Sequence, residues 1–280
     1  MPELPEVEIV RRRLEPVMKA SRFDKVTLRR ADLRRPFSSQ FSRRLAGSTV
    51  LEVGRRAKYL VLALSSRETL LMHLGMSGSF RVERDPRDAD QTRAGGDASG
   101  RHDHVVFHMS SGVIVTFNDP RRFGAMEIVP AGALATHPVF TALGPEPLSP
   151  EFDGFALARA CRGKKTSLKT ALLDQRVVAG LGNIYASEAL YVARLSPWRR
   201  ASAIATASGA PRHAAHALAA AIGTVLASAI ERKAKGRYRS SAFHVYDRES
   251  EPCRRRGCGG TIRRRTQAGR STFFCPRCQR

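Results

Sequence analysis

The sequence has no hydrophobic run long enough to cross a membrane. Its most apolar stretch, residues 214–230, is mostly alanine and is interrupted by histidine, glycine, threonine and serine, whereas a spanning helix needs about 20 predominantly apolar residues. The chain opens with Met-Pro-Glu-Leu-Pro-Glu, which differs from the basic start and apolar core of a secretory signal peptide. We therefore expect an intracellular, cytoplasmic protein that does not bind membranes.

Acidic residues are scarce relative to basic ones. The chain has 25 Asp and Glu against 48 Lys and Arg, which gives a formal net charge of +23. Such an excess attracts polyanions, and nucleic acid is the commonest polyanion in a cell. Membrane-binding proteins usually concentrate basic residues in one amphipathic helix or tail, but here they are spread along the chain. The charge favours a nucleic-acid-binding protein, and a solvated basic surface without a ligand is the alternative.

Hydrophobic spacing indicates a β-rich first part. Residues 5–19 have helical spacing, and Pro5 suits the first turn of that helix. From residue 23 to 130 the period is two, which is typical of strands. The clearest features are strands at 58–64 and 69–73, a hairpin with its turn at 110–112, and a polar surface loop at 84–101. We expect a sandwich or barrel with one helix on it.

The second part is expected to be helical. Five of the 15 prolines fall at residues 130–150, which indicates a linker. The 280 residues, 42% of them hydrophobic, suit two domains with a small addition. Helical spacing follows the linker at residues 155–161, 167–174, 184–195 and 213–232. We predict an α+β protein with an N-terminal domain at 1–130, a linker at 131–150, a helical domain at 151–243 and a zinc finger at 244–280.

Four of the five cysteines form a metal-binding pattern: Cys253, Cys258, Cys275 and Cys278. Two short knuckles separated by 16 residues are typical of one tetrahedral Zn²⁺ site. Two disulfides are the alternative, which a reducing cytoplasm disfavours. The zinc is expected to be structural, because so small a segment buries too little surface to fold alone. Nine arginines and no acidic residue lie between residues 253 and 280, so we expect this segment to contact phosphates.

The N-terminus and one glycine-rich turn carry further hypotheses. Removal of Met1 would expose Pro2 as a secondary amine, and α-amino groups have pKa values of about 8, so part of it would be a neutral nucleophile. Glu3 and Glu6 are placed to transfer a proton and to hold the amine. Asn183 is predicted to cap a helix that starts at Ile184, which would leave N–H groups for a phosphate. Each pattern alone is weak, because most such termini and caps bind nothing.

Taken together, these motifs resemble the formamidopyrimidine-DNA glycosylase family over nearly the whole chain. Related endonuclease VIII proteins typically have Gly where this chain has Leu4. The resemblance rests on blocks that occur in one order: residues 2–8 (PELPEVE), 55–60 (RRAKYL), 73–78 (HLGMSG), 102–104 (HDH), 119–124 (DPRRFG), 143–148 (LGPEPL), 182–185 (GNIY) and the terminal cysteines.

The resemblance implies a monomeric, bifunctional glycosylase and lyase that acts on damaged double-stranded DNA. The implied fold is an N-terminal catalytic β-sandwich followed by a helix-two-turns-helix domain with a zinc hairpin, and DNA lies between the two. The implied catalytic residues are Pro2 as the nucleophile that forms a Schiff base, Glu3 as acid and base, Glu6 orienting the amine, Lys58 near the phosphate and sugar, and Arg270 in the second elimination. The implied DNA contacts are Met76, Arg121 and Phe123, which fill the space of the flipped nucleotide, and His102, Lys165 and Asn183, which hold the backbone.

Two alternatives and one departure accompany this prediction. The same chemistry could act on oxidised pyrimidines, or the chain could be a non-catalytic zinc-ribbon DNA-binding protein. Pure binding would need none of Pro2, Glu3, Glu6 or Lys58. The departure is at residues 232–242, which separate the last long helix from an expected strand at 245–248. This segment is shorter than the loop with which family members close over the flipped base, so we expect weaker discrimination of 8-oxoguanine from guanine.

Overall fold

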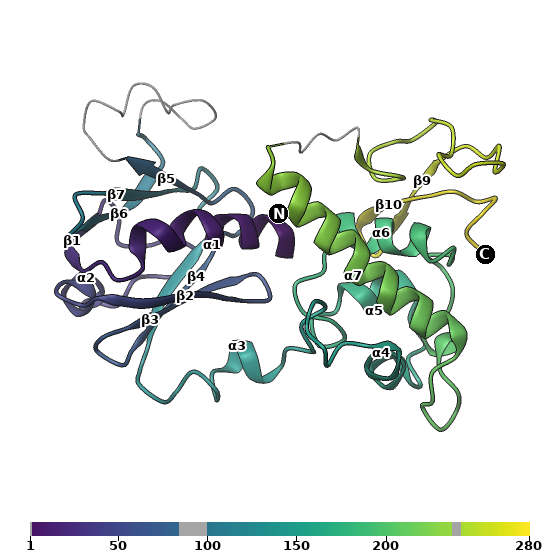
Figure 1. Cartoon of the computed structure of the whole chain (residues 1–280), viewed down its shortest axis with the longest axis horizontal. Coiled ribbons are helices and arrows are strands. Elements are labelled where there is room, and N and C mark those ends of the chain that lie inside the picture. The colour runs from purple at the N-terminus through teal and green to yellow at the C-terminus, as the bar shows by residue number, and fades with distance from the viewer. Residues whose placement is uncertain (1, 84–99, 237–241) are drawn as a thin grey trace. The chain divides into compact units, whose positions relative to one another are not determined.

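The protein consists of two compact units, residues 1–141 and 142–280. The computed structural model describes residues 2–83, 100–236 and 242–280, and Figure 1 traces them from purple to yellow. The predicted surface loop at 84–101 lies almost wholly outside the described residues, as do residues 237–241 of the short segment before the zinc hairpin.

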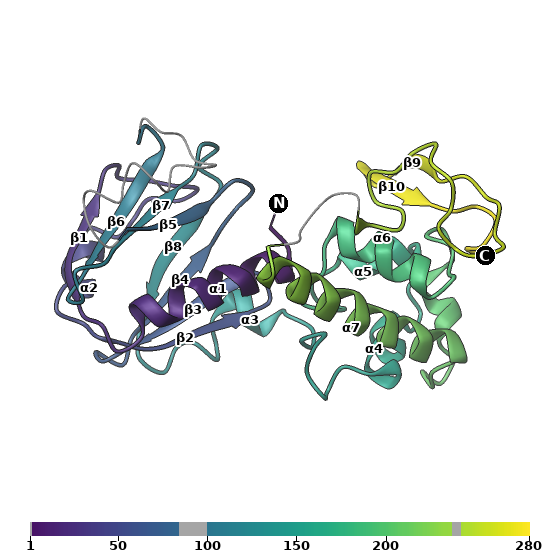
Figure 2. The same ribbon diagram turned by 45° about the horizontal axis from the view of Figure 1, so that its top comes forward.

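The first unit is a sandwich of two four-stranded antiparallel sheets, as Figure 2 shows. Large side chains of both sheets meet in one core, where Phe107 and Phe117 of the first sheet and Leu62 of the second are fully buried. The first sheet has the order β1 (Phe23–Leu28), β6 (Asp103–Met109), β7 (Ile114–Asn118), β5 (Ser79–Glu83), and the second has β2 (Val50–Arg56), β3 (Tyr59–Leu64), β4 (Thr69–His73), β8 (Ala125–Val129). The predicted sandwich is confirmed.

Helix α1 (Leu4–Met18) joins the two sheets. It contacts β2 and β3 of one sheet and β5 of the other. Its buried face carries Val7, Leu14 and Met18 into the sandwich core, with the spacing of an amphipathic helix. Pro5 lies in the first turn, where its missing N–H breaks no helical hydrogen bond. Two short helices, α2 (Phe41–Leu45) and α3 (Pro138–Thr141), complete this unit.

The second unit is helical and ends in a small hairpin. Helix α7 packs against α4 and α6, and its predicted apolar face, which includes Leu218, Ile222 and Leu226, is buried. Length and composition alone would let α7 cross a membrane, but half of its apolar window is buried inside the protein. The elements are α4 (Gly154–Cys161), α5 (Leu168–Leu173), α6 (Asn183–Val192), the 3₁₀ helix η2 (Ala201–Ile204), α7 (His213–Ala234), β9 (Arg263–Gln267) and β10 (Arg270–Phe274).

The prediction of a strand at residues 245–248 is wrong, because the chain turns there. The backbone N–H groups of His244, Val245 and Tyr246 all donate to the Glu188 carboxylate, at 2.7–2.9 Å. Glu188 lies in α6 and is only 3% exposed. One buried carboxylate therefore takes the donors that a strand would have used in a ladder.

Candidate active site, DNA-contact loops and zinc hairpin

The expected nucleophile lies at the start of α1. Glu3 precedes the helix as its N-cap and is 3% exposed, and its backbone N–H donates to Glu6 Oε2 at 2.9 Å. Carboxylates are stabilised at a helix N-terminus by the unsatisfied N–H groups and the positive end of the helix dipole. Pro2 is partly exposed immediately before them. The structure thus brings Pro2, Glu3 and Glu6 together on one helix terminus.

Lys58 lies in the tight turn between β2 and β3. Arg56 and Tyr59 pair across this turn, and the Lys58 residue is only 6% exposed. Ala57, directly before it, has φ +54°, in the left-handed region that disfavours residues with a Cβ. Burial, followed by the charges of Lys58 and Arg34, lowers the pKa of His73 to about 4. The positive charge of Lys58 therefore helps to lower the pKa of a histidine on β4, a strand of the same sheet.

Met76, Arg121 and Phe123 lie on two loops that touch each other. The Arg121 guanidinium lies 4.9 Å from the centroid of the Phe123 ring. Gly75 packs so closely on the second loop that a Cβ there would lie 2.2 Å from the Phe123 carbonyl carbon. Met76 and Phe123 are 41% and 44% exposed, which is high for large apolar side chains. The structure thus presents a thioether, a guanidinium and a ring together at the surface.

Asp119 holds these two loops, a role that the sequence reasoning missed. It is fully buried and accepts from Ser77 Oγ at 2.5 Å and from the Gly124 N–H at 2.7 Å. Its own N–H donates to the His102 carbonyl at 3.0 Å. The Asp-Pro pair was a usable signal, because a short acid before proline often caps a turn. The Asp119 carboxylate therefore binds the loop of Met76 and the loop of Phe123. The Asp119 backbone N–H binds the turn of His102.

Asn183 does not cap a helix, so that expectation is wrong. Helix α6 begins at Asn183 itself and has Gly182 as its N-cap. The Asn183 side-chain amide instead donates to the Ser271 carbonyl at 3.0 Å. Among the described residues, its buried Oδ1 finds no hydrogen-bond donor. Lys165 is exposed in the turn before α5, on the same unit.

The zinc hairpin is anchored by a buried lysine that the sequence reasoning did not select. Lys169 of α5 is 1% exposed, and its Nζ donates to the Ser271 carbonyl at 3.0 Å and to Thr272 Oγ1 at 2.7 Å. A buried ammonium needs such acceptors to offset its lost hydration. Arg270, the exposed first residue of β10, directly precedes this anchored pair. Lysines on helices are usually exposed, so no sequence signal marked Lys169.

Four cysteines form the metal site: Cys253, Cys258, Cys275 and Cys278. Their Sγ atoms all lie within 4.8 Å of one another, with 3.9 Å between Cys253 and Cys278 and 3.6 Å between Cys258 and Cys275. Sulfurs at the corners of a tetrahedral Zn²⁺ site are about 3.8 Å apart, from a Zn–S bond of about 2.3 Å. Burial and the neighbouring thiols raise the pKa of Cys278, so the four ionise together only around a cation. The site therefore holds one structural zinc.

Cys161 does not belong to this cluster. It is fully buried in α4, and burial raises its pKa to about 11. It is a core residue. The site residues as a whole divide between the two units: Pro2, Glu3, Glu6, Lys58, Met76, His102, Arg121 and Phe123 belong to the first, and Lys165, Asn183, Arg270 and the four zinc-binding cysteines to the second.

Family models match the chain in three consecutive segments. These are the formamidopyrimidine-DNA glycosylase N-terminal domain over residues 1–126, the formamidopyrimidine-DNA glycosylase H2TH domain over residues 143–241, and the zinc finger found in FPG and IleRS over residues 250–280. The chain is 57% identical to the formamidopyrimidine-DNA glycosylase of Rhodopseudomonas palustris (strain BisA53) and 56% identical to that of Bradyrhizobium sp. (strain ORS 278). Both alignments span 296 positions and cover 100% of each chain.

Solved structures are similar over the same length. The formamidopyrimidine-DNA glycosylase of Lactococcus lactis, non-covalently bound to DNA that contains an AP site, has a TM-score of 0.84 at 30% identity and covers 99% of each chain. The same protein in complex with DNA containing Fapy-dG has a TM-score of 0.84 at 29% identity, over 99% of this chain and 100% of that one. The corresponding protein of Thermus thermophilus has a TM-score of 0.79 at 37% identity, over 99% of this chain and 98% of that one.

Proposed function

Because the chain belongs to the formamidopyrimidine-DNA glycosylase family, we propose that it repairs oxidised purines in duplex DNA with Pro2 as its nucleophile. The enzyme is a DNA glycosylase with abasic-site lyase activity, and it acts in base-excision repair. The observation that carries the assignment of the nucleophile is the position of Pro2 on a helix terminus, next to the buried Glu3 carboxylate.

The proposed reaction begins at the sugar carbon C1′. The Pro2 nitrogen forms a bond to C1′ while the glycosidic bond breaks, and the purine leaves with that electron pair and takes up a proton. The nitrogen then loses its proton, and its lone pair forms a double bond to C1′ while the bond from C1′ to the ring oxygen breaks. That oxygen takes up a proton, and the opened sugar remains attached as an iminium. Glu3 serves as the acid and base for these transfers, and Glu6, which accepts from the backbone of Glu3, orients the amine. Zinc supplies folding stability to the hairpin when bound.

The iminium withdraws electrons, so both phosphate groups can leave in turn. Loss of a proton from C2′ forms a double bond between C2′ and C3′ and breaks the C3′–O bond to one phosphate. Loss of the C4′ proton then forms a double bond between C4′ and C5′ and breaks the C5′–O bond to the other phosphate. We assign Lys58 to the phosphate and sugar at this centre, and Arg270 to the second elimination. Lysine and arginine side chains are cationic, and a positive charge stabilises a departing phosphate.

DNA binding is assigned to the two loops and to dispersed basic residues. We propose that Met76, Arg121 and Phe123 enter the stack where the damaged nucleotide leaves it, because a flipped base costs a few kcal/mol that inserted side chains offset. His102, Lys165 and Asn183 are assigned to the phosphate backbone. The protein would act as a monomer on DNA in the bacterial cytoplasm, without a membrane partner. The domain limits 1–130, 131–150, 151–243 and 244–280 stand as part of the same proposal.

The test of the nucleophile is covalent trapping. Borohydride reduces the iminium and leaves a stable protein–DNA adduct, so a duplex with one abasic site should trap the protein whose Met1 is removed. An extension before Pro2 should abolish trapping and strand cleavage, and Pro2→Gly, which presents only a primary amine, should slow both strongly. Duplex binding should survive in both variants, since dispersed arginines supply the binding. Full cleavage by protein that retains Met1, verified by mass spectrometry, would refute Pro2 as nucleophile.

A second assay distinguishes the proposed function from its two alternatives. A non-catalytic zinc-ribbon protein would bind the abasic duplex but never trap. An enzyme for oxidised pyrimidines would trap and would excise oxidised thymine or cytosine faster than formamidopyrimidines. Single-turnover excision on a panel of single-lesion duplexes distinguishes these outcomes, and we expect ring-opened purines to be excised fastest.

A further inference from the structure

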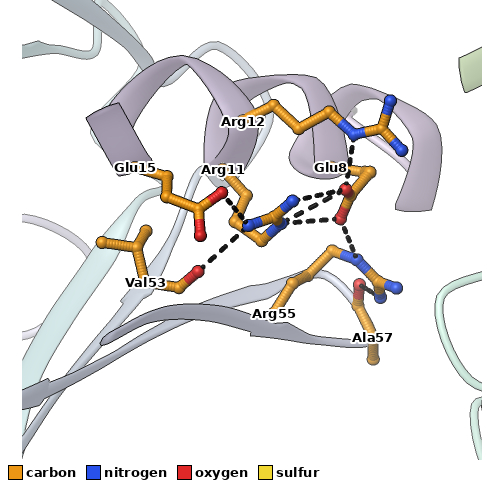
Figure 3. Close-up of polar contacts among 7 residues, drawn as sticks. All are labelled: Glu8, Arg11, Arg12, Glu15, Val53, Arg55 and Ala57. Atoms are coloured by element: carbon orange, nitrogen blue, oxygen red, sulfur yellow. Dashed lines mark hydrogen bonds and ion pairs between the residues drawn. The ribbon is translucent and has the colours of Figure 1, made fainter. Parts of the chain in front are cut away.

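Glu8 of α1 and Arg55 of β2 form an ion pair that joins the N-terminal helix to a sheet. Arg55 Nε lies 3.2 Å from Glu8 Oε2, and the two side chains are only 11% and 12% exposed. Figure 3 shows the Glu8 carboxylate between Arg11 and Arg12 of its own helix and Arg55 of the strand. A pair so shielded from water is screened by salt less than a surface pair.

Arg55 makes a second contact, to the turn that carries Lys58. Its Nη1 donates to the Ala57 carbonyl at 2.9 Å. Ala57 has φ +54°, a conformation that a residue with a Cβ keeps only when its surroundings hold it there. Arg55 therefore contacts both α1, the helix that follows Pro2, and the strained residue directly before Lys58.

We propose that Glu8 and Arg55 are positioning residues that fix Lys58 relative to Pro2. The inference rests on the proposed function, in which these two groups act on one abasic sugar. Glu8 lies two residues after Glu6 on the same rigid helix, so a displacement of the β2–β3 turn from α1 changes the distance between the lysine and the nucleophile. Catalysis depends on such distances, because misplacement by about 1 Å can cost up to about a hundredfold in rate.

Other contacts keep the helix on the strand without Arg55. Arg11 donates from α1 to the Val53 carbonyl of β2 at 3.2 Å and to Glu15 at 2.8 Å, and the apolar face of α1 is buried in the sandwich core. Burial raises the pKa of Glu8, but hydrogen bonds from Arg11, Arg12 and Arg55 outweigh it and lower the pKa overall. Removal of Arg55 should therefore leave an ionised Glu8 and an attached helix, and should loosen the turn that carries Lys58.

The experiment compares full-length, zinc-loaded variants on an abasic duplex. Arg55→Met removes the contacts to Glu8 and to the Ala57 carbonyl. Arg55→Lys keeps the charge but lacks the guanidinium group, which donates to two acceptors at once. The matched control is Arg44→Met, which removes the same charge from another half-buried ion pair of this unit, that with Glu68. Borohydride trapping at saturating enzyme measures covalent chemistry, and affinity for an uncleavable tetrahydrofuran-site duplex measures binding.

We expect Arg55→Met and Arg55→Lys to slow trapping by about tenfold or more, with binding within about twofold, because geometry and not contact area is lost. Arg44→Met should trap at the wild-type rate. Adding Ala57→Gly to Arg55→Met should restore part of the rate, since glycine adopts a positive φ without being held. A purely structural role would instead lower the melting temperature and would not be rescued by glycine.

Equal trapping rates for the Arg55 and Arg44 variants would overturn the inference. A rate loss that Ala57→Gly leaves unchanged would overturn it as well. If Arg55→Met does not fold, Arg55→Lys and its Ala57→Gly double variant decide the question in the same way. Wild-type protein that never traps would refute the proposed function instead, so the two failures are distinguishable.

Discussion

His73 is a histidine that its surroundings hold neutral. It lies on β4, its ring packs 4.8 Å from the Tyr59 ring, and its Nδ1 accepts from the Gly75 N–H at 3.0 Å. Burial is the largest cause of its lowered pKa of about 4, and the Lys58 and Arg34 charges add to it. Gly75 precedes Met76, so the neutral ring also supports one of the two surface loops.

This lowered pKa predicts a specific loss of stability in acid. In the unfolded chain histidine titrates at about 6.5, so between pH 6.5 and 4 the unfolded state binds more protons than the folded one. Stability from this group is therefore complete above pH 6.5 and falls as the pH falls toward 4. His73→Gln should reduce the loss between pH 7 and 4.5 by about 2–3 kcal/mol. Urea unfolding of the full chain, followed by far-ultraviolet circular dichroism at several pH values, measures it. An equally steep loss in His73→Gln would contradict the assignment.

At the scale of elements, the zinc hairpin depends on both its metal and its anchor. Strand β9 is almost wholly exposed, and Lys169 and Asn183 attach β10 to α5 and α6 through the Ser271 carbonyl. Trp198, the single tryptophan of the chain, packs on Phe274 with ring centroids 4.5 Å apart. Trp198 lies outside the hairpin but contacts it, so its fluorescence reports on the packing of the hairpin.

Removal of zinc should unfold the hairpin and leave the sandwich folded. Without a cation the four thiols lose the interaction that orders a segment too small to fold by burial. A strong chelator should shift the Trp198 emission to the red and weaken DNA binding, while the far-ultraviolet signal of the sheets persists. Active protein with well under one zinc per chain by metal analysis would contradict this prediction.

At the scale of the whole molecule, the net charge of +23 makes DNA binding depend on salt. Lys165, assigned to a phosphate, provides the test. Each neutralised phosphate contributes about 0.9 to the slope of log K against log salt, so Lys165→Gln should reduce that slope by about 1. Lys164→Gln is the matched control, because Lys164 Nζ lies 3.8 Å from an Asp174 carboxylate of its own unit. Equal slopes for the two variants would show that Lys165 does not contact a phosphate.

Local patterns predicted those elements whose signal is contained in neighbouring residues. The expected strand 69–73 is β4 with the same bounds, and the expected helix 213–232 is α7, which extends to Ala234. Pairing across the sheets could not be predicted, because β1 lies beside β6 and β4 beside β8. Those neighbours are far apart along the chain, so their pairing depends on which hydrophobic faces the whole unit can bury together.

The metal site and the family of this protein can be recognised from the amino-acid sequence alone. Cysteine spacing constrains a tetrahedral site locally, and the ordered motifs need no three-dimensional information to be recognised. The three-dimensional fold was needed to show which polar residues are buried: Asp119 under the two surface loops, Lys169 under the hairpin, Glu188 at the turn after α7, and the Glu8–Arg55 pair. A single sequence leads one to expect that a charged residue is exposed to solvent. Whether it is buried depends on partners that arrive from distant segments when the chain folds.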